Sequence, residues 1–125
     1  MKQYSVIVGD NDIELRDFYK EILAEKGLKV GTATTGVELL RMYKEAPADL
    51  VIMDTLDSEM NRTLKYSDVF NILKYMNPDV KILFISGLDV DKEEFENFHK
   101  GVTLLGKPLS QEAILKAVSI FLKEV

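Results

Sequence analysis

The sequence of 125 residues predicts a doubly wound α/β domain, in which a five-stranded parallel sheet is covered by helices. Two observations predict this fold. Five short apolar runs, rich in β-branched residues, alternate along the chain with segments that have the hydrophobic spacing of helices. The runs are almost uninterrupted by polar residues, which is typical of parallel strands that are buried on both faces.

The strands are expected where the apolar runs are bounded by Gly, Asp, Asn or Pro. The predicted strands are Ser5–Val8, Lys29–Ala33, Leu50–Met53, Lys81–Ile85 and Val102–Leu105.

Five helices are expected between and after these strands. The first and the last are predicted by apolar residues at helical spacing, and the other three span Gly36–Glu45, Ser67–Met76 and Val90–Lys100. Ser67 and Ser110 are predicted N-caps, Gly27 follows the first helix, and Asn77-Pro78 ends the third. The apolar residues of the first and last helices are Leu15, Phe18, Tyr19, Ile22 and Leu23, and Ile114, Ala117, Val118, Phe121 and Leu122.

The composition excludes several classes of function. The chain has no cysteine, which rules out disulfides and thiolate metal sites. A net charge of -5 without a basic stretch argues against direct binding of nucleic acid. The apolar runs are far shorter than the roughly 20 residues of a membrane helix, and the N-terminus resembles no signal peptide. We therefore expect a single cytoplasmic domain over residues 1–125.

Polar residues gather where the predicted strands end. The carboxyl ends of parallel strands meet at one edge of the sheet, where doubly wound proteins place their functional groups. Taken singly, an aspartate after a strand is more often a turn residue or a helix N-cap, so the argument depends on the combination. The residues at these ends are Asp10, Asn11 and Asp12, then Asp54, then Ser86, and then Lys107-Pro108.

These residue types suit phosphoryl transfer to a carboxylate. Asp54 directly follows a buried strand and could attack a phosphoryl group as a nucleophile. Oxygen ligands near Asp10 would bind Mg²⁺, while the Ser86 hydroxyl and the Lys107 ammonium would bind phosphoryl oxygens. A cluster of carboxylates also needs a cation to offset its repulsion.

With these residues the sequence resembles the receiver domain of two-component response regulators, over essentially its whole length. The resemblance implies a flavodoxin-like sheet with strand order 2-1-3-4-5 and five flanking helices. The segments that carry it are Val6-Ile7-Val8-Gly9-Asp10-Asn11-Asp12 with Arg16 downstream, Asp49-Leu50-Val51-Ile52-Met53-Asp54, Ile82-Leu83-Phe84-Ile85-Ser86-Gly87, and Gly106-Lys107-Pro108-Leu109.

The resemblance also assigns roles to individual residues. Asp54 is similar to the phosphoacceptor, Ser86 to the hydroxyl residue and Lys107 to the invariant lysine. Mg²⁺ would be held by Asp10, Asn11, Asp54 and the backbone carbonyl of Leu56, with Asp12 able to contribute through water. Such a domain takes its phosphoryl group from a sensor histidine kinase or a histidine phosphotransfer protein, and catalyses its own phosphorylation and dephosphorylation. Its output partner would bind the face of the fourth helix, fifth strand and fifth helix.

The sequence departs from the family pattern at several positions. Asn11 stands where the family has its second acidic residue, which predicts weaker binding of Mg²⁺. Leu104 stands where the family has an aromatic switch residue, so any output switch must differ. The loop after Asp54 lacks the usual Pro-Gly turn and has extra residues between Asn61 and Lys65. Two apolar residues near the path of water, Leu56 and Leu88, predict slow hydrolysis of a phosphorylated form.

Three alternatives share the layout. The most serious is a receiver-like interaction module that signals without phosphorylation, suggested by Asn11, Leu104 and the altered loop after Asp54. A haloacid-dehalogenase-like phosphohydrolase would use the acidic residues after the first strand, but the chain has no further acidic metal motif after Lys107. A flavodoxin-like electron carrier would need a phosphate loop rich in Ser, Thr and Gly, where this chain has acids.

Overall fold

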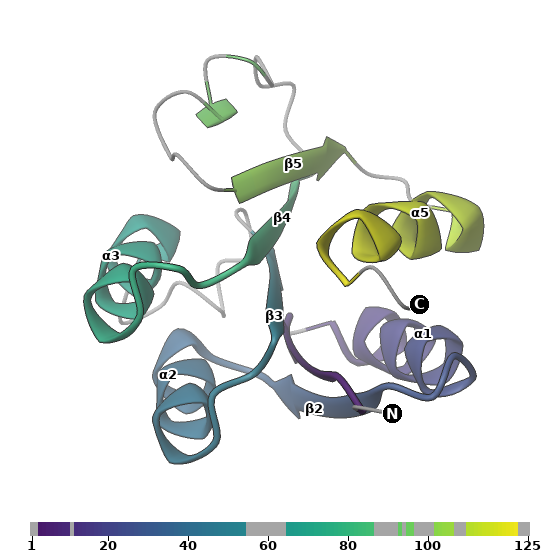
Figure 1. The fold of residues 1–125 in the computed structure, drawn as a ribbon, viewed down its shortest axis with the longest axis horizontal. Coiled ribbons are helices and arrows are strands. Elements are labelled where there is room, and N and C mark those ends of the chain that lie inside the picture. The colour runs from purple at the N-terminus through teal and green to yellow at the C-terminus, as the bar shows by residue number, and fades with distance from the viewer. Residues whose placement is uncertain are drawn as a thin grey trace.

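The computed structural model describes residues 3–10, 12–54, 65–86, 93, 95–96, 102–106 and 110–122. For Ser86 and for residues 102–106 it describes the backbone. Strands and helices alternate along the described chain, as the sequence predicts (Figure 1). The strands are β1 Ser5–Gly9, β2 Lys29–Ala33, β3 Leu50–Asp54, β4 Ile82–Ser86 and β5 Val102–Gly106, and the helices are α1 Ile13–Ala24, α2 Gly36–Glu45, α3 Tyr66–Met76 and α5 Gln111–Phe121.

The five strands form one parallel sheet in the order β2-β1-β3-β4-β5. This confirms the predicted strand order. The switch point lies between β1 and β3, because the chain leaves β1 toward β2 on one side and continues from β3 toward β5 on the other. In doubly wound sheets, ligands bind beyond the carboxyl ends of the strands at this point.

The helix ends are fixed by local hydrogen bonds. Ser110 caps α5, because its side chain accepts a hydrogen bond from the backbone N–H of Ala113 at 3.1 Å. Gly27 ends the turn after α1 with a φ of 81°, a conformation that L-residues with a Cβ rarely adopt. The C-cap of α3 is Asn77, as predicted.

The third helix begins earlier than predicted, and the fourth is described only in part. The prediction of Ser67 as an N-cap is wrong, because α3 begins one residue earlier and its N-cap is Lys65. The Asp68 carboxylate accepts a hydrogen bond from the backbone N–H of Lys65 at 3.1 Å, and this contact secures the helix start. Most of the predicted fourth helix, residues 90–100, lies outside the described residues; within it, Glu93, Phe95 and Glu96 are helical.

The sheet is covered on both faces, and each face has its own hydrophobic core. Helices α1 and α5 cover one face, and α2 and α3 cover the other (Figure 1). Along β3, Leu50 and Ile52 belong to the α1/α5 core, while Val51 and Met53 belong to the α2/α3 core. This alternation follows from the two-residue period of a strand.

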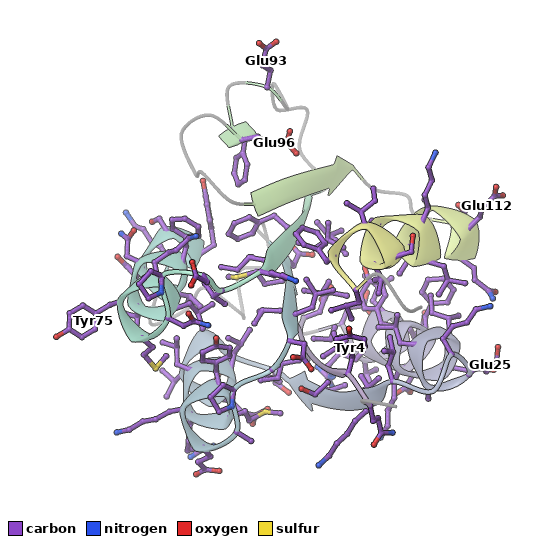
Figure 2. The ribbon with its side chains drawn as sticks, in the orientation of Figure 1. Tyr4, Glu25, Tyr75, Glu93, Glu96 and Glu112 are labelled. Carbon is purple, nitrogen blue, oxygen red and sulfur yellow. The ribbon has the colours of Figure 1, made fainter. Side chains whose placement is uncertain are left out.

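Aromatic rings extend the α2/α3 core toward β4. The ring of Phe84 lies 5.8 Å from that of Tyr66 and 5.3 Å from that of Phe95, in edge-to-face arrangements. Tyr66 and Phe95 stack at 6.0 Å. Further along α3, by contrast, Tyr75 points away from the molecule and is 91% exposed (Figure 2).

Candidate functional site

Asp54 is the last residue of β3 and lies at the switch point of the sheet. All five residues of the strand are buried, and Asp54 itself is only 3% exposed. Because Leu50 and Ile52 face the α1/α5 core, the period of the strand places the Asp54 side chain on the same face. A carboxylate is therefore held at the rim of the core on a rigid strand.

Asp10 follows β1 and is 2% exposed. Its backbone N–H donates to the carbonyl of Ala33 at 3.1 Å, and its own carbonyl accepts from the Arg16 guanidinium at 2.8 Å. Its carboxylate accepts a hydrogen bond from the backbone N–H of Asp12 at 2.9 Å. These three contacts fix both the backbone and the side chain of Asp10.

The register of the sheet brings Asp10 and Asp54 together. Val8 pairs with Ile52 and Gly9 with Met53, so extending the register by one residue sets Asp10 beside Asp54. In the part of the chain that the structure describes, these two are the only buried charged side chains. We call Asp10 and Asp54 the carboxylate pair.

The carboxylate pair suits a small divalent cation. Adjacent strands lie about 4.8 Å apart. Two negative charges about 5 Å apart repel by roughly 3 kcal/mol at an effective dielectric of about 20, so a cation between them is strongly favoured. Mg²⁺ is commonly bound through one or two carboxylates while it keeps several waters. Among the described residues, no group of three or more Asp, Glu or His side chains forms a metal site by itself.

Asp12 has a structural role in this arrangement. It is the N-cap of α1, and one of its carboxylate oxygens accepts hydrogen bonds from the backbone N–H groups of Glu14 at 2.9 Å and Leu15 at 3.3 Å. Its side chain is exposed. Asp12 is thus an N-cap, which is the common role of an aspartate after a strand, and a contribution to metal binding through water stays a prediction.

The other predicted site residues are placed only in part. Ser86 ends β4, and its backbone pairs with Gly106 at the end of β5, so the chain reaches the same edge of the sheet there. Asn11, Leu56 and Lys107 lie outside the described residues. The structure therefore brings together Asp10 and Asp54 and the backbone of Ser86, and the roles assigned to all of these residues stay predictions.

Sequence reasoning treated Tyr19 of α1 only as a core residue, but its hydroxyl belongs to the surroundings of the site. Burial raises the pKa of Tyr19, and the carboxylates of Asp10, Asp54 and Asp12 raise this pKa further. The hydroxyl is thus within electrostatic range of the carboxylate pair. The signal in the sequence is the spacing, since Tyr19 lies two helical turns after Asp12 on the inner face of α1.

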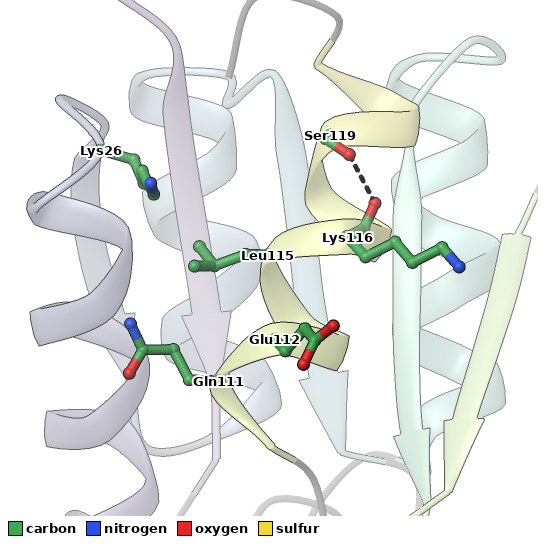
Figure 3. Close-up of a pocket in the computed structure, with 6 residues that line it drawn as sticks. All are labelled: Lys26, Gln111, Glu112, Leu115, Lys116 and Ser119. Carbon is green, nitrogen blue, oxygen red and sulfur yellow. Dashed lines mark hydrogen bonds between the residues drawn. The ribbon is translucent and has the colours of Figure 1, made fainter.

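A separate groove lies between α5 and the turn that follows α1, and it contains none of the predicted site residues. Figure 3 shows Leu115 at its centre, and Ser119 donates a hydrogen bond to the carbonyl of Lys116 at 2.7 Å. Its remaining lining residues are Lys26, Gln111 and Glu112. The groove carries charges of both signs and no buried charged group, so it does not compete with the carboxylate pair as a candidate site.

A family comparison decides what kind of domain carries this site. The model of the response regulator receiver domain matches residues 6–119. The chain belongs to this family. Membership confirms the resemblance found in the sequence and implies a histidine kinase partner, and receiver domains typically bind Mg²⁺. In the described part of this receiver domain, no helix is long and apolar enough to cross a membrane.

Individual relatives agree with this assignment. The receiver domain is 28% identical to the chemotaxis protein CheY of Thermotoga maritima, over 91% of this chain and 93% of that protein. It is 23% identical to CheY of Bacillus subtilis, over 93% of this chain and 95% of that protein. Both relatives match over nearly their full length.

Solved structures support the fold. The receiver domain of the Francisella response regulator 1452 superposes with a TM-score of 0.83 at 25% identity, covering 97% of this chain and 98% of that chain. CheY4 of Vibrio cholerae superposes with a TM-score of 0.84 at 20% identity, over 96% and 99% of the two chains. NtrX of Brucella abortus gives 0.85 at 18% identity over 98% of this chain, but only 27% of the NtrX chain is matched.

Proposed function

We propose that this receiver domain accepts a phosphoryl group on the carboxylate of Asp54 from a histidine kinase or a histidine phosphotransfer protein. The observation that carries the proposal is the carboxylate pair: Asp54 is 3% exposed at the end of β3, beside an equally buried Asp10. A buried carboxylate on a rigid strand is well oriented for attack on a phosphoryl group.

The reaction forms an acyl phosphate. One oxygen of Asp54 attacks the phosphorus atom, a P–O bond forms, and the P–N bond to the donor histidine breaks with its electron pair returning to the imidazole. Backbone placement at the end of β4 supports a role for the Ser86 hydroxyl in binding a phosphoryl oxygen. Lys107, which directly follows the end of β5, would bind another phosphoryl oxygen as an ammonium ion.

The carboxylate pair also supports binding of Mg²⁺. We infer that Asp10, Asn11, Asp54 and the backbone carbonyl of Leu56 would hold the ion, with Asp12 contributing through water. When bound, Mg²⁺ neutralises negative charge on the phosphoryl oxygens. Asn11 keeps an oxygen ligand but removes one negative charge, so binding should be weaker than at a site with two acidic residues in these positions.

Phosphorylation can be tested by intact-mass measurement after incubation with acetyl phosphate and Mg²⁺. Wild type should gain the mass of one phosphoryl group, and the isosteric variant Asp54→Asn should gain none. Asp79→Asn is a matched control, because Asp79 is exposed and precedes β4 at the opposite edge of the sheet. It should be modified like wild type.

The outcome separates the two leading functions. A mass gain that persists in Asp54→Asn would refute the assignment of the acceptor. No gain in wild type, with acetyl phosphate or with a phosphorylated kinase as donor, would favour the receiver-like interaction module that signals without phosphorylation.

A further inference from the structure

The hydroxyl of Tyr19 is buried without a hydrogen bond partner. Tyr19 is 1% exposed, and within the part of the chain that the structure describes its Oη atom is the only buried side-chain polar atom that has no hydrogen bond. An unsatisfied buried hydroxyl destabilises a protein, whereas a phenylalanine would fill the same space without that penalty. The hydroxyl is therefore a group whose role the proposed phosphorylation chemistry leaves unexplained.

The position of Tyr19 directs its hydroxyl toward the carboxylate pair. The ring lies in the α1/α5 core together with Val8 and Ile52. The next residues on the same face of these two strands are Asp10 and Asp54. Side chains on a helix lean toward its N-terminus, and α1 begins at the edge of the sheet where Asp10 and Asp54 lie.

Electrostatics agrees with this placement. The carboxylates of Asp10 and Asp54 both favour the protonated form of Tyr19, and of the two Asp10 has the larger influence. A tyrosine hydroxyl that stays protonated is a hydrogen bond donor, and carboxylates are the strongest acceptors in its surroundings. A buried water can join such a donor to such an acceptor, since buried waters typically link polar groups that lack direct partners.

We propose that Tyr19 is a positioning residue for the phosphoacceptor site: its hydroxyl donates a hydrogen bond, through one buried water, to the carboxylate of Asp10 from the core side. The inference rests on the proposed function, because it treats Asp10 as a Mg²⁺ ligand. Groups that hydrogen-bond to a metal ligand fix its orientation, and their loss commonly weakens metal binding.

The test compares Tyr19→Phe with Tyr43→Phe. Tyr43 is also 1% exposed, but it lies in the α2/α3 core and its hydroxyl accepts a hydrogen bond from Asn77 at 3.0 Å. Both substitutions remove one buried hydroxyl, and only Tyr19 is near the carboxylate pair. Isothermal titration with Mg²⁺ alone should show affinity weakened about 3- to 10-fold in Tyr19→Phe. The affinity of Tyr43→Phe should equal that of wild type.

A metal-free measurement provides a second readout. Urea denaturation in EDTA, applied to wild type, Tyr19→Phe, Asp10→Ala and the double variant, measures the coupling of the two side chains. Tyr19→Phe should lower the folding equilibrium constant about 3- to 10-fold when Asp10 is present, and should leave it equal or raise it in the Asp10→Ala background.

The outcomes are distinct from those of the phosphorylation test. If Tyr19→Phe stabilises the protein whether or not Asp10 is present, the hydroxyl has no partner and the inference is overturned. It is also overturned if the Mg²⁺ affinities of wild type and Tyr19→Phe are the same. If Asp54 fails to accept phosphate while Tyr19→Phe still weakens Mg²⁺ binding and still couples to Asp10, phosphorylation of Asp54 is refuted but the positioning of Asp10 by Tyr19 is not.

Discussion

Substitution of Asp54 by Asn should stabilise the receiver domain when Mg²⁺ is absent. The side chain keeps its shape but loses its charge, so the repulsion with Asp10 disappears. At about 5 Å and an effective dielectric of about 20 this repulsion is roughly 3 kcal/mol. Asp54 also has interactions with other groups, which the substitution changes. We therefore expect a net gain of about 1–2 kcal/mol in the free energy of unfolding, or several degrees in Tm.

The measurement is urea denaturation followed by circular dichroism, first in EDTA and then with increasing Mg²⁺. Wild type should become more stable as Mg²⁺ is added, because an ion that binds only the folded state shifts the equilibrium toward folding. The advantage of Asp54→Asn should then shrink or reverse. The control Asp79→Asn changes the same charge at an exposed position and should alter stability by no more than about 0.5 kcal/mol.

The result that refutes this reasoning is a less stable Asp54→Asn protein in EDTA. It would mean that the other interactions of the Asp54 carboxylate stabilise the folded state more than repulsion from Asp10 destabilises it. The carboxylate pair would then not favour a bound cation. The prediction is also contradicted if saturating Mg²⁺ leaves the stability advantage of Asp54→Asn unchanged, because the cation would then not bind at the carboxylate pair.

Three further predictions follow from other positions. Asn11→Asp should tighten Mg²⁺ binding about tenfold by restoring a charged ligand, and equal affinities in isothermal titration would contradict this. Asp12→Ala should lower stability by about 1 kcal/mol in urea denaturation, because α1 loses both cap hydrogen bonds. Gly27→Ala should lower the free energy of unfolding by about 1 kcal/mol. The cause is the φ of 81° alone, since no atom beyond the two neighbouring residues lies within 4 Å of the added Cβ. An unchanged midpoint of urea denaturation would show that the turn relaxes to fit alanine.

The fold was predictable because its signals are local. Buried parallel strands require nearly continuous apolar runs, and each predicted strand is found within one residue at either end. Helix α2 was predicted with its observed bounds, Gly36–Glu45. The start of α3 was not, because Ser67 looks like a cap in sequence, whereas the observed start depends on the Asp68 carboxylate reaching back to Lys65.

Only part of the candidate site was predictable from the sequence. The burial of Asp10 and Asp54 follows from the apolar runs that precede them, and their proximity follows from the strand order. The environment of the Tyr19 hydroxyl does not follow from either, because a hydrophobic pattern counts tyrosine as apolar. The position of the hydroxyl depends on how α1 is rotated and placed against the sheet, and only the packed structure contains this information.

The division of the core by the sheet has a practical consequence for engineering. The carboxylate pair lies at the carboxyl ends of β1 and β3, on the face of the sheet that packs against α1 and α5. The opposite layer, with Tyr43 and Leu73, meets only the far side of the same strands. Repacking α2 and α3 therefore offers a way to tune thermal robustness without redesigning the reactive groups, while changes beneath α1 alter both together.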